Sequence, residues 1–217
     1  MSNAPLLCVS VAPVDIAACR AELDGCSVAE IRLDDMAVSA PEARSLFGWE
    51  LTLIATCRPG RHDDGVRREL LIAAIEGGAA YVDVAVDDSP RLRTTVVDAA
   101  RAKSCKVILS FHDDRHTPTR ATLCDIRQRC FDEGADLAKL ACQVESSSDA
   151  ARLLGILDDD RPTVVVGMGP LGRVVRIAAP LLGSPIVYVR RDGGRETAPG
   201  QLERTAFERL LREWIGG

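Results

Sequence analysis

The chain of 217 residues is 47% hydrophobic and 27% charged, with a formal net charge of −5. This balance suits one globular domain with a sizeable core and disfavours nucleic-acid binding, which needs clustered positive charge. No apolar run approaches the ~20 residues that span a bilayer, and the N-terminus lacks the basic and apolar regions of a secretory signal. We therefore expect a cytoplasmic protein with neither nucleic-acid nor membrane partners.

Eight short apolar runs are predicted to be strands. They lie at residues 6–11, 28–34, 51–57, 81–86, 105–111, 135–141, 163–167 and 185–190. These runs are too short for typical helices and too continuously apolar for half-exposed strands. Such a pattern is expected of parallel strands covered by helices.

Segments with apolar residues at helical spacing lie between the strands. Clear examples cover residues 65–79, 89–103, 119–135 and 200–215. Gly77 and Gly78 end the first of these helices, and Ser89 followed by Pro90 begins the second as N-cap and first helical residue. Strands and helices therefore alternate along the whole chain.

Eight strand–helix repeats predict an α/β fold, a single (β/α)8 TIM barrel over residues 1–217 with eight parallel strands inside a ring of helices. We expect residues 1–4 to be disordered or left over from cloning. A doubly wound open sheet is the alternative, although it usually has fewer strands. In a barrel, reactive residues gather where strands end and βα loops begin.

The eight cysteines contain no Cys-x-x-Cys pair. Several lie inside strand-like apolar runs, where a free thiol acts as a small hydrophobe, so we expect reduced cysteines. No cluster of His, Cys and carboxylates has the spacing of metal ligands. The glycines of residues 167–172 lack the G-x-G-x-x-G spacing, and no Walker lysine follows them, so no nucleotide site is assigned.

Lys139 lies within the sixth predicted strand among apolar residues. Burial without a carboxylate partner would lower the pKa of its amine and increase the fraction of free base. A free amine in an apolar pocket is what Schiff-base catalysis requires. The alternative is a structural lysine that extends outward between helices.

His112 follows the fifth predicted strand, one strand before Lys139. Adjacent strands lie about 5 Å apart, so both side chains can reach one substrate atom. Histidine titrates near neutral pH and can both remove and return a proton. The alternative is a loop histidine bonded to a neighbouring carbonyl, and we prefer that structural role for His62 and His116.

Charged residues also mark the predicted rim of the barrel. Glu30 and Arg32 alternate with apolar residues, so they share one face of the second strand and would supply a hydrogen-bond acceptor and a forked donor. A salt bridge on the outer face is the alternative. Arg58 ends the third strand and Arg176 lies in the helix after the seventh, which suits a small anionic substrate.

Thr197 and Gln201 lie after the eighth strand in the segment Thr-Ala-Pro-Gly-Gln. In a barrel this loop commonly contributes to anion binding. By itself the segment could also simply cap a helix.

In order along the chain, these motifs resemble type I 3-dehydroquinate dehydratases from the first strand to the last helix. The matching segments are Ser10, Glu-x-Arg at 30–32, Arg58, Ser-Phe-His-Asp around His112, Gly-Ala-Asp-x-x-Lys ending at Lys139, Met-Gly-x-x-Gly-x-x-x-Arg at 168–176 and Thr-Ala-Pro-Gly-Gln at 197–201. Each motif is weak alone. Their order, spacing and strand-end placement make the set specific.

The resemblance implies a (β/α)8 lyase of the shikimate pathway that dehydrates 3-dehydroquinate to 3-dehydroshikimate, towards chorismate and the aromatic amino acids. Lys139 would form an imine with the ring ketone, and His112 would remove the adjacent proton and then protonate the departing hydroxyl. The family assigns the substrate carboxylate and hydroxyls to Ser10, Glu30, Arg32, Arg58, Arg176, Thr197 and Gln201. It implies no metal or organic cofactor, and a homodimer is expected.

Two positions depart from the family pattern. His62 stands where a glutamate near the catalytic histidine is usual, and Ala85 stands where a second glutamate is common. A carboxylate that orients His112 would then come from Asp63, Asp64 or Asp83, and its absence would shift the pKa of the imidazole.

Two other functions stay open from the sequence. Another Schiff-base barrel, such as a class I aldolase, would also use a lysine in the sixth strand, but the Glu-x-Arg and Ala-Pro-Gly-Gln motifs disfavour it. A catalytically impaired ligand-binding barrel would explain the two departures, but a decayed site need not keep both Lys139 and His112.

Overall fold

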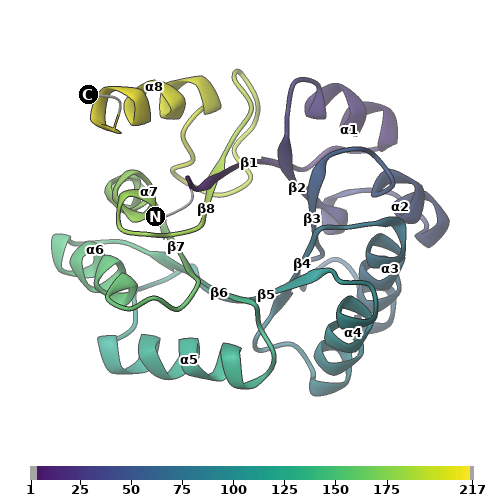
Figure 1. The fold of residues 1–217 in the computed structure, drawn as a ribbon, viewed down its shortest axis with the longest axis horizontal. Coiled ribbons are helices and arrows are strands. Elements are labelled where there is room, and N and C mark those ends of the chain that lie inside the picture. Colours follow the sequence, from purple (N-terminus) through teal and green to yellow (C-terminus); the bar gives the residue numbers. More distant parts are fainter. Residues whose placement is uncertain (1–3, 216–217) are drawn as a thin grey trace.

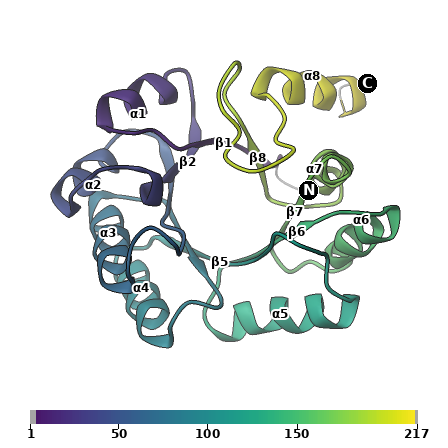
Figure 2. The ribbon, with the colours of Figure 1, turned by 180° about the vertical axis from the view of Figure 1, so that it is seen from behind.

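The computed structural model describes residues 4–215, with side chains described as far as residue 213, as a ring of strands surrounded by helices (Figures 1 and 2). The strands are β1 (Leu6–Val11), β2 (Val28–Arg32), β3 (Thr52–Thr56), β4 (Tyr81–Ala85), β5 (Lys106–Asp113), β6 (Leu137–Gln143), β7 (Thr163–Met168) and β8 (Ile186–Val189). The helices are α1 (Ile16–Leu23), α2 (Ala40–Leu46), α3 (Asp64–Gly77), α4 (Pro90–Ala102), α5 (Arg120–Asp132), α6 (Ser147–Leu154), α7 (Gly172–Leu181) and α8 (Arg204–Ile215).

The strand order confirms the predicted (β/α)8 barrel. The order is β7-β6-β5-β4-β3-β2-β1-β8, so strands that follow one another in the chain pair in parallel, and β8 pairs with β1. β7 and β8 lie next to each other and complete a nearly closed ring, which excludes the open sheet (Figures 1 and 2). None of the helices in residues 4–215 has both the length and the apolar character needed to pass through a membrane. The tail expected at residues 1–4 lies outside the described residues, apart from the exposed Ala4.

The predicted strands match the observed ones to within two residues at each end. β5 extends beyond the prediction, to Asp113, because the ladder to β6 continues through the pairs His112↔Ala141 and Asp113↔Cys142. His112 therefore belongs to the strand itself, and its backbone is fixed by the sheet. The predicted end caps of α3 and α4 are present, since Gly78 adopts φ +112° and Ser89 accepts a hydrogen bond from the Leu92 amide.

The last helix begins later than predicted, at Arg204 and not near residue 200. Gly200 has φ +84°, which a helix does not allow, and the Arg190 amide donates to the Leu202 carbonyl. Residues 200–203 therefore form a short extension beside the end of β8. This geometry turns the segment 197–201 inward over the barrel.

Alternation along the strands builds two layers inside the barrel. The lower layer is an apolar cluster that includes Cys8, Val28, Ile54, Ile108, Leu137, Val164 and Ile186. Two residues further along six strands lie the polar side chains Ser10, Glu30, Thr56, Asp83, Ser110 and Lys139. The strand register pairs Ser10 with Glu30, Thr56 with Asp83, and Ser110 with Lys139. Because successive residues point to opposite faces, this polar layer rests directly on an apolar floor.

Two glycines allow α7 to approach β7 closely. A Cβ placed on Gly167 would lie 2.5 Å from the backbone oxygen of Gly172 and 2.8 Å from the Cβ of Val175. The glycine-rich stretch at 167–172 is therefore a backbone packing contact. The contact also fixes where α7 begins, and so where Arg176 meets the rim of the barrel.

We predict that Gly167→Ala lowers the free energy of unfolding by about 1–3 kcal/mol, because the added methyl group overlaps rigid backbone. Denaturant unfolding measures the loss. Gly48→Ala is the control, since its Cβ would make only an ordinary contact 3.5 Å from the Ser45 oxygen. An equal effect of the two substitutions would contradict the packing role of Gly167.

Candidate active site

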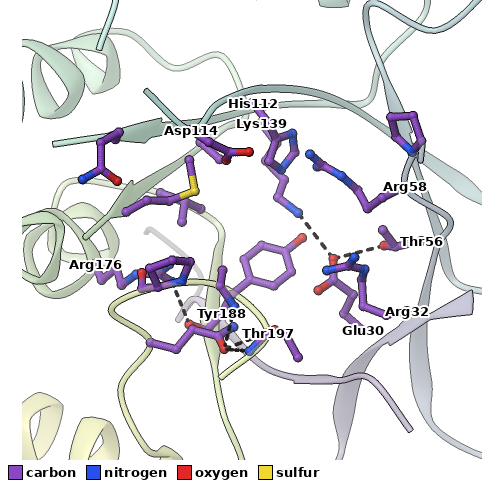
Figure 3. A pocket seen from close by; sticks show the side chains of 18 residues that line it. Glu30, Arg32, Thr56, Arg58, His112, Asp114, Lys139, Arg176, Tyr188 and Thr197 are labelled. Atoms are coloured by element: carbon purple, nitrogen blue, oxygen red, sulfur yellow. Dashed lines mark hydrogen bonds and ion pairs between the residues drawn. The ribbon is translucent and has the colours of Figure 1, made fainter. Parts of the chain in front are cut away.

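A cavity of about 430 Å³ opens at the C-terminal ends of the strands (Figure 3). It brings together eight of the nine site residues predicted from the sequence: Glu30, Arg32, Arg58, His112, Lys139, Arg176, Thr197 and Gln201. The ninth, Ser10, lies behind Glu30 and does not line this cavity. The barrel therefore collects residues from both ends of the chain at one site.

The amine of Lys139 is buried between two carboxylates. Its Nζ lies 2.8 Å from Asp83 Oδ2 and 3.4 Å from Glu30 Oε1, and the Lys139 side chain is only 7% exposed. Figure 3 shows Lys139 and Glu30 pointing towards one another across the cavity. Asp83 does not line the cavity, so it supports the amine from the far side.

These carboxylates overturn the expectation of a lowered lysine pKa. Burial by itself lowers the pKa of Lys139, but the charges of Asp83 and Glu30 and the hydrogen bond to Asp83 outweigh burial and raise the pKa above its ordinary value. Lys139 is therefore an ammonium ion at neutral pH. A reaction that needs the free amine must first move a proton from Lys139 to an acceptor.

Hydroxyl groups hold the two carboxylates in place. Glu30 accepts hydrogen bonds from Ser10 Oγ at 2.5 Å and from Thr56 Oγ1 at 3.0 Å, and Asp83 accepts one from Ser110 Oγ at 2.5 Å. Burial by itself would raise the pKa of Glu30. The charge of Lys139 and the hydrogen bond from Ser10 outweigh burial and lower this pKa below its ordinary value, so Glu30 stays ionised. Ser10 thus orients Glu30 from behind.

His112 stands above Lys139 as a neutral imidazole. Burial lowers the pKa of His112 well below its ordinary value, and the positive charges of Arg58, Lys139 and Arg32 add to the effect. Its Nδ1 atom is buried and has no hydrogen-bond partner among residues 4–215. The unprotonated form, which can accept a proton, therefore predominates at neutral pH.

None of the three carboxylates proposed as partners of His112 forms a hydrogen bond or ion pair with it. Asp63 caps α3 by accepting from the Val66 amide, Asp64 accepts from Ser89 Oγ, and Asp83 is paired with Lys139. The first two are drawn to the N-terminus of α3, where carboxylates are stabilised by the helix. His62, at the position of the usual family glutamate, has a buried Nε2 that is likewise without a partner in the described structure.

The three arginines of the site differ in whether their guanidinium groups already have an acidic partner. Arg32 lines the cavity but is already paired with Asp34, through Nε at 3.0 Å and Nη2 at 2.5 Å, and its contact with the substrate stays a prediction. Arg58 lines the cavity with no ion-pair partner in residues 4–215. Within residues 4–215, the buried Arg176 donates only to two backbone carbonyls, and burial lowers its pKa to about 10.

The loop after β8 closes one side of the cavity. Gln201 Oε1 accepts from the Thr197 amide at 2.7 Å and from Thr197 Oγ1 at 3.1 Å. Because the amide oxygen is occupied in this way, the nitrogen of Gln201 is the end that can donate to a ligand. Thr197 Oγ1 also lies 2.8 Å from Ser10 Oγ, which links this loop to Glu30.

Three interior residues were not assigned to the lysine from the sequence: Asp83, Ser110 and Tyr188. Each lies at the level of Lys139 inside the barrel, and Tyr188 places its ring centroid 4.0 Å from Lys139 Nζ. The signal that could have found them is the alternation along each strand, counted from the end that faces the loops.

A buried amine, a neutral imidazole and the unpaired Arg58 meet at the C-terminal ends of the strands. They define the class of this protein, a (β/α)8 enzyme with its site in the usual place for that fold.

Comparison with known proteins identifies the family. The sequence model of type I 3-dehydroquinase matches residues 4–214. The chain is 34% identical to 3-dehydroquinate dehydratase of Desulfotalea psychrophila, covering 82% of this chain and 83% of that protein, and 34% identical to that of Methanothermobacter thermautotrophicus, covering 87% and 86%. The chain therefore belongs to the type I 3-dehydroquinase family of the shikimate pathway, and it is a hydro-lyase.

Solved structures agree with the fold. Type I 3-dehydroquinate dehydratase from Clostridium difficile, solved with covalently modified comenic acid, has a TM-score of 0.88 at 22% identity, covering 99% of this chain and 93% of that chain. The 3-dehydroquinate dehydratase from Geobacillus kaustophilus has a TM-score of 0.87 at 24% identity, covering 98% and 91%. The barrel architecture is therefore shared closely despite low sequence identity.

We predict that Asp83→Asn lowers the pKa of Lys139, because it removes the charge that raises this pKa most. The pH dependence of Lys139 labelling by a small amine-selective reagent, followed by mass spectrometry, measures the change. The labelling midpoint moves to lower pH in the variant, while the exposed Asp160→Asn control leaves it in place. A midpoint that stays unchanged in Asp83→Asn would show that this carboxylate does not govern the lysine.

Proposed function

We propose that this protein dehydrates 3-dehydroquinate to 3-dehydroshikimate through an imine on Lys139. The observation that carries the proposal is the buried Lys139 ammonium between Asp83 and Glu30, in a cavity that also holds His112. The relatives named 3-dehydroquinate dehydratase support the choice of substrate. Cytoplasmic location and a homodimer stay predictions from the sequence.

Imine formation begins with a proton transfer from Lys139. Asp83 is the nearest acceptor, at 2.8 Å, and it approaches from outside the cavity, so it can take the proton without meeting the substrate. The free amine then adds to the ring ketone. The ketone oxygen leaves as water with the two protons that Lys139 gives up, and the iminium keeps the positive charge.

His112 then acts on the carbon next to the iminium. A proton beside an iminium is far more acidic than one beside a ketone, and the neutral imidazole accepts it. Because burial and the surrounding cations lower the pKa of His112, the imidazolium that forms is a strong acid and readily returns the proton to the departing hydroxyl. General acid–base catalysis of this kind contributes ~10²–10⁴-fold.

The free cations supply the anion-binding part of the site. Arg176 keeps its charge at neutral pH, and its Nε is buried without a partner in the described residues. We assign the substrate carboxylate to Arg176 together with the Gln201 amide nitrogen, because charge-assisted hydrogen bonds are the strong ones. Arg58, Glu30 and Thr197 face the same cavity and are assigned to the hydroxyls, with Ser10 acting through Glu30 and Arg32 through its charge.

The chemistry requires no metal or organic cofactor, because the iminium itself serves as the electron sink. A class I aldolase would use the same imine, so the identity of the product separates the two. A catalytically impaired barrel would bind the substrate, or trap it, without releasing a conjugated product.

The test is to incubate the protein with 3-dehydroquinate, add borohydride and locate the adduct by mass spectrometry. The wild type gains the reduced substrate on Lys139 and forms the conjugated product in parallel samples without borohydride. Lys139→Ala abolishes both, whereas His112→Ala still traps the imine but turns over ~10²–10⁴-fold more slowly. Lys106→Ala, at an exposed lysine, is the control and behaves as the wild type.

Three outcomes would decide against the proposal. No mass gain on Lys139 with normal turnover excludes the imine. Normal rates in Lys139→Ala exclude the lysine. A trapped adduct without conjugated product in the wild type favours the impaired barrel.

A further inference from the structure

Tyr188 places an aromatic ring and a hydroxyl beside the reactive amine, and nothing in the proposed mechanism uses it. The residue lies on β8, lines the cavity and is 6% exposed. Lys139 Nζ stands 4.0 Å from the centroid of its ring. Figure 3 shows the phenol oxygen directed towards the Lys139 amine and the Glu30 carboxylate.

The hydroxyl of Tyr188 is an unsatisfied polar group. It is closed to solvent and has no hydrogen-bond partner among residues 4–215. Leaving a buried hydroxyl unpaired is unfavourable, and phenylalanine would fill the same space without that penalty. Its neighbour across the β1–β8 ladder is the apolar Cys8, so the missing partner does not come from the sheet.

The ketone oxygen of the substrate can serve as the hydrogen-bond acceptor that the Tyr188 hydroxyl lacks. To react, the carbonyl carbon must come within bonding reach of Lys139 Nζ, and its oxygen then enters the space beside the phenol. Burial and the charges of Glu30 and Asp83 raise the pKa of Tyr188 well above its ordinary value, so the phenol keeps its proton and acts as a donor. A neutral donor suits an oxygen that is becoming negative.

The aromatic face of Tyr188 stabilises the positive charge at Lys139 both before and after imine formation. Lys139 carries one positive charge as the ammonium and one as the iminium, and an aromatic face attracts both. The carboxylates, in contrast, lose hydrogen bonds as Nζ gives up its protons. The ring is therefore the contact that persists through the step.

We propose that Tyr188 is a further catalytic residue of the imine-forming step, whose hydroxyl donates a hydrogen bond to the ketone oxygen as Lys139 adds, and whose ring supports the cation. The inference rests on the proposed function. As the N–C bond forms, the π pair of the C=O bond moves to oxygen, and the C–O bond then breaks to release water carrying the two protons from Lys139. Tyr188 stabilises the developing oxyanion and transfers no proton.

The test compares Tyr188→Phe and Tyr188→Leu by rapid-quench borohydride trapping with 3-dehydroquinate. Tyr188→Phe slows imine formation ~10²-fold, the loss typical for one oxyanion donor, while the adduct on Lys139 still accumulates at long times. Tyr188→Leu slows it further, because the ring face is also lost. Tyr81→Phe, which removes the hydroxyl of the only other tyrosine, at the start of β4, leaves the rate unchanged.

Thermal unfolding guards against a structural explanation. Tyr188→Phe is expected to keep or raise the Tm, because it removes an unpaired buried hydroxyl. A trapping rate equal to the wild type overturns the proposal, and so does a clear fall in Tm, which would mean that the hydroxyl has a structural partner. Failure of the wild type to trap substrate at all is a different result, and it contradicts the proposed function itself.

Discussion

A buried ammonium between two carboxylates is the interaction on which the interior of this barrel depends. Lys139, Asp83 and Glu30 come from three strands, and together they bury charges that would be very unfavourable alone. Removing Lys139 would leave two buried carboxylates without a cation between them, on an apolar floor. The hydroxyls of Ser10, Thr56 and Ser110 are therefore part of the same arrangement, because they satisfy the remaining carboxylate oxygens.

The cluster also divides the acid–base work of the site. The carboxylates keep Lys139 charged, whereas burial and the positive charges of nearby cations, Lys139 among them, keep His112 neutral, so the two pKa values move in opposite directions. Pairs of groups whose environments push their pKa values apart mark acid and base roles in enzymes. Lys139 must lose a proton before it can react, whereas the neutral His112 can already accept one.

The sequence predicts most of the fold and the main site residues, because both follow from local patterns. Eight apolar runs define the strands, and Lys139, Glu30 and His112 stand out as charged or titratable residues at strand positions. Contacts between strands distant in sequence are harder to predict, since they depend on the tilt and register of the closed barrel. For that reason the sequence does not pair Asp83 with Lys139, and the direction it predicts for the lysine pKa is wrong. Loop carboxylates such as Asp63 were also misassigned, because capping α3 competes for them.

The central claim is that the substrate is held covalently on Lys139, so that its ketone oxygen is lost as water and regained from water on release. Turnover of 3-dehydroquinate in water enriched in oxygen-18 tests this directly. The account predicts that the ring ketone of 3-dehydroshikimate carries oxygen-18 from the first turnovers, faster than the free ketones exchange without protein. Normal turnover with retention of the original ketone oxygen would contradict it.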